Sequence, residues 1–208
     1  MIAIIDYGSG NTFSVYNALD FLGHEVVITR DPKEISQASH IVLPGVGTFG
    51  NCMAQICDYN LPEILYHEVI ENKKPFLGIC VGMQVLASIG LEKGSFKGLG
   101  WIDGTVKQMD VSEYNLSLPH VGWNDIKIVQ NNPLFKGIKK DLSFYFVHSY
   151  HFVPKDTNVI EATTTYGIEF VAAILKDNIF ATQFHPEKSQ KNGLTILDNF
   201  AEWDGVSC

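Results

Sequence analysis

The sequence predicts an α/β fold with a mostly parallel central sheet, helices on both of its faces, and an additional antiparallel or mixed sheet from the second half. Two observations support this. Over the first half, short apolar runs typical of buried strands alternate with helical patterns. From about Gly98 onward, short β-rich segments follow one another with turn residues between them, which is typical of antiparallel or mixed sheet.

The first half is predicted element by element from its apolar pattern. Residues 2–6 form an apolar run that opens onto glycines, and residues 12–22 follow with Val15, Leu19 and Leu22 on one helical face. Further strands are predicted at 25–29, 40–44 and 75–79, and further helices at 49–57, 62–72 and 83–89. In the second half, β-rich segments are predicted at 100–109, 120–129, 144–153, 159–166, 169–175 and 178–184, and a last helix at 191–203.

The composition is that of a folded chain with a buried core. The 208 residues are 46% apolar and 18% charged, which argues against disorder. No repeat, low-complexity tract or linker interrupts the pattern, so we expect residues 1–208 to form a single domain.

Charge and apolar runs exclude several classes of partner. The net charge is −8 and no Lys/Arg cluster occurs, so we expect no nucleic-acid partner. No run approaches the ~18 apolar residues of a membrane span. The first residues lack the features of a signal peptide, and we therefore expect a cytoplasmic protein with reduced thiols. We expect Cys52, Cys57 and Cys208 to pack in the core or to lie at the surface.

The most informative stretch places Cys80 between Gly78 and Gly82, after a strand and before a helix. This is the pattern of a nucleophile elbow, with sulfur in place of oxygen. Small neighbours let strand and helix approach, the helix N-terminus favours a thiolate, and the N–H of Val81 is free for a developing oxyanion. A lone cysteine more often packs in a core, but the two glycines at this junction favour a nucleophile.

A thiol nucleophile needs a base, and His185 is the best candidate among seven histidines. It follows an apolar strand, so it should reach the same sheet edge as Cys80. Glu187, two residues on, could orient the imidazole. A His-x-Glu metal pair is the alternative, but no third ligand stands out, so we expect no metal. His120, His148 and His151 remain open as alternative bases, while His24, His40 and His67 have ordinary contexts.

Two glycine-containing loops complete the candidates. Residues 44–47, "PGVG", follow a strand and could supply a second oxyanion donor, although a simple turn explains them equally well. Residues 8–11, "GSGN", could cradle a phosphate, but Phe13 stands where that pattern requires a third glycine, which weakens this interpretation.

The stretches "GICVGMQ" and "FHPEKS" resemble the triad-type, or class I, glutamine amidotransferases. "IIDYGSGN", "LPGVGTFG", "LPHVGWN" and "YFVHSYHF" are similar to one branch of that family, the glutaminase subunits of imidazole glycerol phosphate synthases of histidine biosynthesis. The resemblance extends from residue 2 to about residue 190. It implies a flavodoxin-like fold.

The resemblance also implies a reaction and a set of roles. Cys80 would attack the side-chain amide of L-glutamine and form a γ-glutamyl thioester, with His185 as acid and base and Glu187 as its orienter. The backbone N–H groups of Val81 and Val46 would form the oxyanion hole, and the second would need a peptide reorientation. Family positions that line the glutamine site are matched by Gly47, Gln84, His148, Ser149 and Tyr150.

The resemblance further implies a partner and no cofactor. Ammonia would pass to a (β/α)₈-barrel synthase subunit in a heterodimer, and react there with a phosphoribulosyl-formimino carboxamide ribotide. Residues at the partner face would be Asn11, Trp123, Tyr145 and Lys188. Val121 stands where methionine is commoner, which leaves the partner's identity more open. Because the "PGVG" loop can rest with its N–H turned away, we expect the isolated chain to be a slow glutaminase.

Three alternatives remain at this point. A paralogous glutaminase could feed ammonia to a different synthase or sugar amidase, for example in the synthesis of an amidino-sugar. A non-catalytic binding protein could use the same scaffold. A cysteine peptidase or another thiol enzyme could use the same elbow.

Overall fold

In the computed structural model, residues 1–130, 132–138 and 143–206 are described. Among these residues, eight strands form the main sheet, in the order β2-β1-β3-β4-β14-β13-β12-β9. The parallel part comprises β2 (Val26–Thr29), β1 (Ile2–Ile5), β3 (His40–Gly45), β4 (Phe76–Cys80) and β14 (Ile179–Thr182). The antiparallel part comprises β13 (Ile168–Lys176), β12 (Ile160–Tyr166) and β9 (Lys127–Ile128). The order β2-β1-β3-β4-β14 is that of a flavodoxin-like sheet.

Two smaller sheets come from the second half of the chain. One pairs β10 (Ser143–His148) with β8 (His120–Asp125) in antiparallel fashion. The other runs in the order β11 (Tyr150–Pro154), β7 (Gly104–Gln108), β5 (Ile89–Gly90) and β6 (Phe96–Lys97). The predicted mixture of parallel and antiparallel sheet is confirmed, with the refinement that four of the later strands, β9, β12, β13 and β14, belong to the main sheet.

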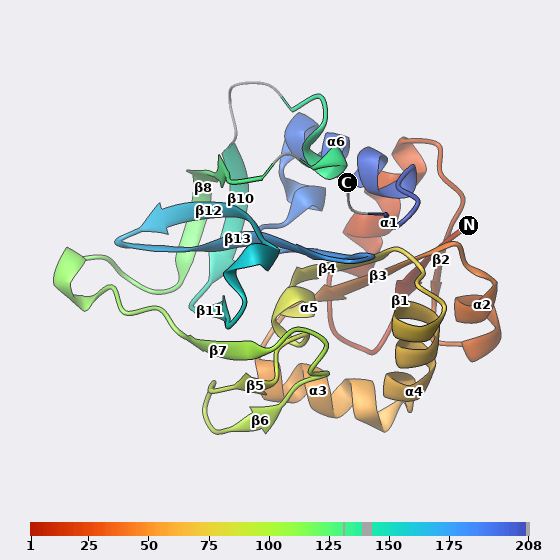
Figure 1. The fold of residues 1–208 in the computed structure, drawn as a ribbon, viewed down its shortest axis with the longest axis horizontal. Coiled ribbons are helices and arrows are strands. Elements are labelled where there is room, and N and C mark those ends of the chain that lie inside the picture. The colour runs from red at the N-terminus through yellow and green to blue at the C-terminus, as the bar shows by residue number, and fades with distance from the viewer. Residues whose placement is uncertain (131, 139–142, 207–208) are drawn as a thin grey trace.

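Helices cover both faces of the parallel part, as predicted. Figure 1 shows α1 (Thr12–Phe21) and α6 (Gln190–Ala201) on one side of the sheet and α3 (Phe49–Asp58) and α4 (Leu61–Tyr66) on the other. The remaining helices are short: α2 (Pro32–Gln37), the π-helical turn η1 (His67–Glu71), α5 (Val81–Gln84), and the 3₁₀ helices η2 (Ser112–Tyr114), η3 (Pro133–Phe135), η4 (Thr157–Val159) and η5 (Pro186–Lys188).

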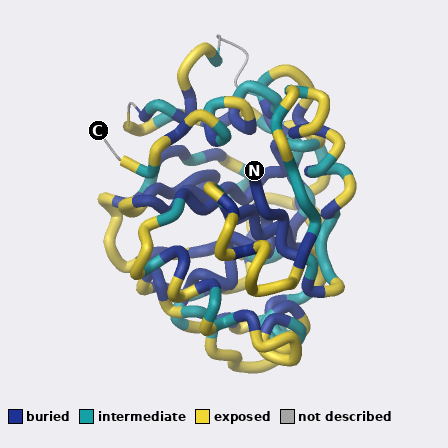
Figure 2. Tube along the Cα trace, turned by 90° about the vertical axis from the view of Figure 1, so that its right-hand side faces the viewer, coloured by how far each residue is buried: buried dark blue, intermediate teal, exposed yellow. Residues whose placement is uncertain are grey.

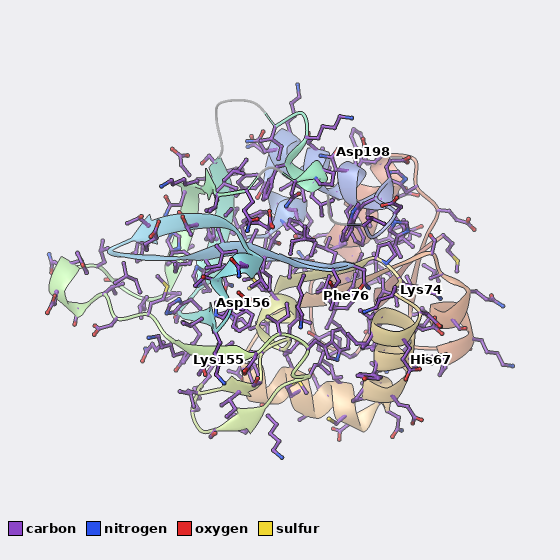
Figure 3. All side chains as sticks on the ribbon, in the orientation of Figure 1. His67, Lys74, Phe76, Lys155, Asp156 and Asp198 are labelled. Carbon is purple, nitrogen blue, oxygen red and sulfur yellow. The ribbon has the colours of Figure 1, made fainter. Side chains whose placement is uncertain are left out.

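The core lies between these helical layers. Every residue of β1 and β4 is buried, because parallel strands covered on both faces have no solvent-facing side. Figure 2 shows buried segments of the chain at the centre of the molecule and exposed segments around them. Phe76, at the middle of Figure 3, is fully buried and packs edge-on against Trp101 at 5.3 Å between ring centroids. This packing fixes the strand that carries Cys80.

Two local predictions differ from the structure. The helix predicted at 83–89 is wrong, since α5 ends at Gln84 and a turn leads into β5. The carbonyls of Val85, Leu86 and Ala87 accept hydrogen bonds from the N–H groups of residues 99, 102 and 100, so tertiary contacts replace the helical ladder. The helix α2 was not predicted, although Asp31 caps it by accepting from the Lys33 N–H.

Candidate active site

Cys80 ends β4 on a strained turn. Its φ is +56° and its ψ is −109°, a conformation that L-residues rarely adopt. A Cβ on Gly82 would overlap the Leu43 carbonyl oxygen, and a Cβ on Gly78 would lie 2.8 Å from the Gly82 oxygen. Both glycines are therefore required by close backbone approach, and the elbow geometry expected from the sequence is present.

His185 reaches the same sheet edge from the neighbouring strand. β14 runs parallel to β4 with Thr182 paired to Ile79, and His185 lies three residues beyond the end of β14. The His185 N–H donates to the Tyr145 carbonyl at 2.9 Å, and the Ser189 hydroxyl donates to the His185 carbonyl at 2.6 Å. The backbone that carries the imidazole is thus held on both sides.

Glu187 lies against the imidazole of His185. The Nδ1 of His185 is 2.8 Å from the Glu187 Oε1, and the two side chains are 2% and 1% exposed. The His185 Nε2 is buried without a hydrogen-bond partner among the described residues. Burial lowers the pKa of His185, but the charge of the nearby Cys80, followed by the hydrogen bond and charge of Glu187, outweighs it, and the net pKa is raised.

Two of the other buried histidines, His148 and His120, form a separate hydrogen-bonded chain. The His148 Nδ1 lies 2.9 Å from the Tyr150 carbonyl, which only accepts, so Nδ1 carries the hydrogen. Burial lowers the pKa of His148 to about 3, so the ring is neutral and its Nε2 accepts from the His120 Nδ1 at 3.3 Å. The Asn124 Nδ2 lies 3.4 Å from the His120 Nε2. His120 and His148, which the sequence left open as alternative bases, therefore both take part in this hydrogen-bonded chain.

The remaining histidines are not placed as bases. His151 is buried, its pKa is lowered to about 4 chiefly by burial, and it does not line the cavity beside Cys80. His24 bonds Asp198 at 2.9 Å and His40 bonds the Trp203 carbonyl at 2.8 Å. His67 pairs with Glu71 one helical turn away. Figure 3 shows His67 and Asp198 on the two opposite helical layers.

A cavity of about 490 Å³ opens beside Cys80 and His185. All the residues expected at the glutamine site or the oxyanion hole line it: Val46, Gly47, Val81, Gln84, His148, Ser149 and Tyr150. Sequence reasoning missed five further lining residues, Glu92, Lys93, Gln108, Pro119 and Val147. They come from the small sheets and their loops, and no local pattern links them to Cys80.

Gln183 is a second omission, and it touches the thiol directly. Its Nε2 lies 3.7 Å from the Cys80 Sγ, and its Oε1 accepts from the Gln84 Nε2 at 3.0 Å. Gln84 also donates to the Tyr150 carbonyl at 3.0 Å. The two buried amides therefore tie the elbow to β14 and β11. The signal for Gln183 was a polar residue at the end of a buried apolar strand.

Comparisons with known proteins give the family of this chain. The family described as glutamine amidotransferase class-I matches residues 3–203. The chain belongs to the class-I glutamine amidotransferase family. Within that family, it is 49% identical to the imidazole glycerol phosphate synthase subunit HisH of Geobacter sulfurreducens, covering 97% of this chain and 98% of the relative. It is 50% identical to the subunit of the same name from Methanocaldococcus jannaschii, covering 97% and 99%.

Solved structures share the fold of this chain. A structure titled glutamine amidotransferase superposes with a TM-score of 0.74 at 19% identity, covering 99% of this chain and 100% of that one. PurLQS from Thermotoga maritima superposes with a TM-score of 0.75 at 18% identity, covering 97% of each chain. The predicted class-I amidotransferase fold is therefore confirmed.

Three of the four residues expected at a partner face gather at one surface of this amidotransferase. The rings of Trp123 and Tyr145, paired across β8 and β10, lie 6.2 Å apart, and the Lys188 Nζ lies 5.9 Å from the Tyr145 ring centroid. Trp123 is 48% exposed. Asn11 stands directly before α1. The Tyr145 carbonyl accepts a hydrogen bond from the His185 N–H. This surface is therefore in direct contact with the backbone of the candidate base.

The other predictions have plain outcomes. Cys52 is buried and Cys57 is exposed, while Cys208 lies outside the described residues. Within the described parts of the chain, no group of three His, Cys, Asp or Glu side chains could hold a metal ion. In the same residues, no helix combines the length and apolar character that crossing a bilayer requires.

Proposed function

We propose that this chain is the glutaminase subunit of an imidazole glycerol phosphate synthase of histidine biosynthesis. It hydrolyses L-glutamine to L-glutamate and ammonia, and it delivers the ammonia to a (β/α)₈-barrel synthase subunit in a cytoplasmic heterodimer. Residues 1–208 act as a single amidotransferase domain. The observation that carries the proposal is the buried His185–Glu187 pair, with its uncommitted Nε2, beside Cys80 on a strained elbow.

The reaction begins with attack of the Cys80 sulfur on the side-chain amide carbon of glutamine. The carbonyl oxygen becomes an oxyanion, which the backbone N–H groups of Val81 and Val46 stabilise. His185 passes a proton from Nε2 to the leaving nitrogen, so ammonia departs and a γ-glutamyl thioester remains on Cys80. Glu187 keeps the imidazole in the tautomer and orientation that this transfer needs.

Hydrolysis of the thioester completes the cycle. His185 takes a proton from water, the resulting hydroxide attacks the thioester carbon, and glutamate leaves as the Cys80 sulfur is released. Gln84 and Gln183 keep the elbow in register with β11 and β14 during both steps. Gly47, His148, Ser149 and Tyr150 line the cavity and would contact the glutamine.

The surface at Trp123, Tyr145 and Lys188 supports the proposed partner face. An aromatic pair with a cation beside it, half exposed, is a surface suited to burial against another protein. Asn11, directly before α1, is the fourth residue that we assign to the partner face. Because Tyr145 bonds the His185 backbone, a partner at this surface can bias the active arrangement, and the isolated chain should be slow.

The test is a glutaminase assay of the chain alone and of the chain mixed with the barrel subunit of the same organism's histidine pathway. Glutamate release is measured with and without the carboxamide ribotide, with Cys80→Ser as control. We expect release to rise strongly only with both partner and ribotide, and Cys80→Ser to abolish it. Full-speed hydrolysis by the isolated chain would contradict partner activation. Stimulation by a different synthase or sugar amidase, with no effect of the ribotide, would assign the chain to a paralogous pathway.

A further inference from the structure

Two side chains from the β1–α1 loop bond alternate carbonyls of the candidate oxyanion loop. The Tyr7 hydroxyl donates to the Pro44 carbonyl at 2.8 Å, and the Ser9 hydroxyl donates to the Val46 carbonyl at 2.6 Å. The thiol of Cys52, from α3, also donates to the Val46 carbonyl, at 3.4 Å. The carbonyls on either side of the Gly45–Val46 peptide are therefore both anchored.

The backbone is built to bring these two loops together. β1 and β3 are neighbours at the point where the strand order reverses, so the loops that leave them meet at one crevice. A Cβ on Gly10 would lie 2.8 Å from the Pro44 oxygen, and a Cβ on Gly45 would lie 2.9 Å from the Tyr7 hydroxyl. The contact thus depends on glycine in both loops. The "GSGN" stretch, weak as a phosphate cradle, has this structural role instead.

The donors keep their hydrogens over the working pH range. Burial, with the nearby Cys52, raises the pKa of Tyr7 above its ordinary value, so the phenol stays protonated. Burial also raises the pKa of the Cys52 thiol. Each group is therefore a lasting donor to a carbonyl oxygen, which can only accept.

Geometry sets what this anchoring can do. A planar peptide turns as a unit by changes in ψ of the residue before it and φ of the residue after it. With the Pro44 and Val46 carbonyls held, the peptide between them can turn while its neighbours stay in place. That peptide carries the Val46 N–H and follows Gly45, which is paired with Cys80 in the sheet. Gly47, at φ +98°, has no atom within 4 Å of a would-be Cβ and leaves the far side open.

We propose that Tyr7 and Ser9 are positioning residues for glutamine hydrolysis: they anchor the peptides on both sides of Gly45–Val46, so that reorientation is confined to the one peptide whose N–H faces the oxyanion. Cys52 is a weaker third anchor, because a thiol is a poor donor. The inference rests on the proposed function, since it assigns a role only if Val46 donates to an oxyanion in a partner-stimulated glutaminase.

The test uses Ser9→Ala in the complete complex with the barrel subunit and ribotide, with kcat and KM for glutamine measured separately. Loss of one anchoring hydrogen bond should lower the stimulated kcat roughly 5- to 10-fold, while KM stays within about twofold. Ser9→Thr keeps the hydroxyl and should restore kcat. Ser39→Ala is the matched control, because its hydroxyl also donates to a carbonyl, that of Met1, at the opposite end of β3.

Tyr7→Phe supplies a second variant that removes only a hydroxyl, and it should lower the stimulated kcat in the same way. Urea unfolding of each variant shows whether the fold is kept. A Ser9→Ala complex with the wild-type kcat, or a loss that Ser9→Thr does not restore, overturns the inference while leaving the glutaminase assignment intact. A wild-type chain that the barrel subunit and ribotide do not stimulate overturns both the inference and the proposed partner activation.

Discussion

His185 and His148 line the same cavity, and both are buried, with 1% and 7% of their surface exposed. Burial pushes the pKa of each ring downward. In His185 the neighbouring Cys80 and Glu187 reverse that effect, whereas in His148 the hydrogen bond to the Tyr150 carbonyl does not offset burial and the neighbouring histidines lower the pKa further, so the ring stays neutral. The difference shows that the partners of a buried imidazole, and not its burial, decide whether it can hold a proton.

The largest expected effect comes from replacing each of the two histidines by asparagine, which exchanges the ring for an amide. His185→Asn should lower kcat for glutamine hydrolysis roughly 10²- to 10⁴-fold, because the proton carrier is lost. His148→Asn is the matched control, since its amide can still donate to the Tyr150 carbonyl, and it should change kcat by less than about tenfold. Steady-state kinetics of the stimulated complex measure both. Equal losses in the two variants would remove the distinction.

Glu187→Gln sharpens the comparison by changing only the partner of His185. An amide can donate to Nδ1 where the carboxylate accepts from it, so the imidazole would adopt the wrong tautomer. We expect kcat to fall about 10²-fold or more, with a smaller change in KM. Retention of full activity would show that the 2.8 Å contact does not orient the base.

A third prediction concerns stability and pH at His148. Its pKa is lowered from 6.5 to about 3, so the unfolded chain takes up a proton as pH falls through 6.5 while the folded chain does not. The free energy of unfolding should therefore decrease below pH 6.5, by about 2 kcal/mol at pH 5 from this group. Urea unfolding of the wild type and of His148→Asn between pH 7 and 5 measures the difference in slope. Parallel curves would contradict the account.

The raised pKa of His185 has the opposite sign and can be followed directly. It favours the folded state below the ordinary pKa of 6.5, and this contribution is lost as pH rises through the folded pKa. In Cys80→Ala the influence of the thiol is gone, and the pKa of His185 should move down toward 6.5. NMR titration of the imidazole reports this, and His148 serves as the internal reference. An unchanged His185 pKa would mean that the thiol is not its neighbour in solution.

The elbow and the base were predictable because their signals are local. Gly78 and Gly82 flank Cys80 in the sequence, and His185 follows an apolar strand whose end must meet the same sheet edge. Gln183 lies two residues before the predicted His185, yet its contact with Cys80 depends on strand register, which no local pattern gives.

The misses share a physical cause, which is contact between segments far apart in the chain. The helix predicted at 83–89 gave way to hydrogen bonds from residues 99–102. Glu92 and Lys93, in the loop between β5 and β6, line the cavity beside Cys80, and the pairing of β5 with β7 that holds this loop joins segments distant in the sequence. Ser9 belongs to the stretch 8–11, whose pattern favoured a weak phosphate interpretation, and Tyr7 precedes it. Only the pairing of β1 beside β3 brings both side chains to the candidate oxyanion loop, residues 44–47.

The central claim is that Cys80 carries the γ-glutamyl group with His185 as its base. The most direct measurement is mass spectrometry of the complex after brief mixing of wild type and His185→Asn with glutamine, followed by acid quench and peptide mapping. In the wild type, the account predicts an adduct of one γ-glutamyl group on the peptide that contains Cys80. In Cys80→Ser it predicts no adduct. An adduct on another residue, or glutamate release by Cys80→Ser at the wild-type rate, would contradict it.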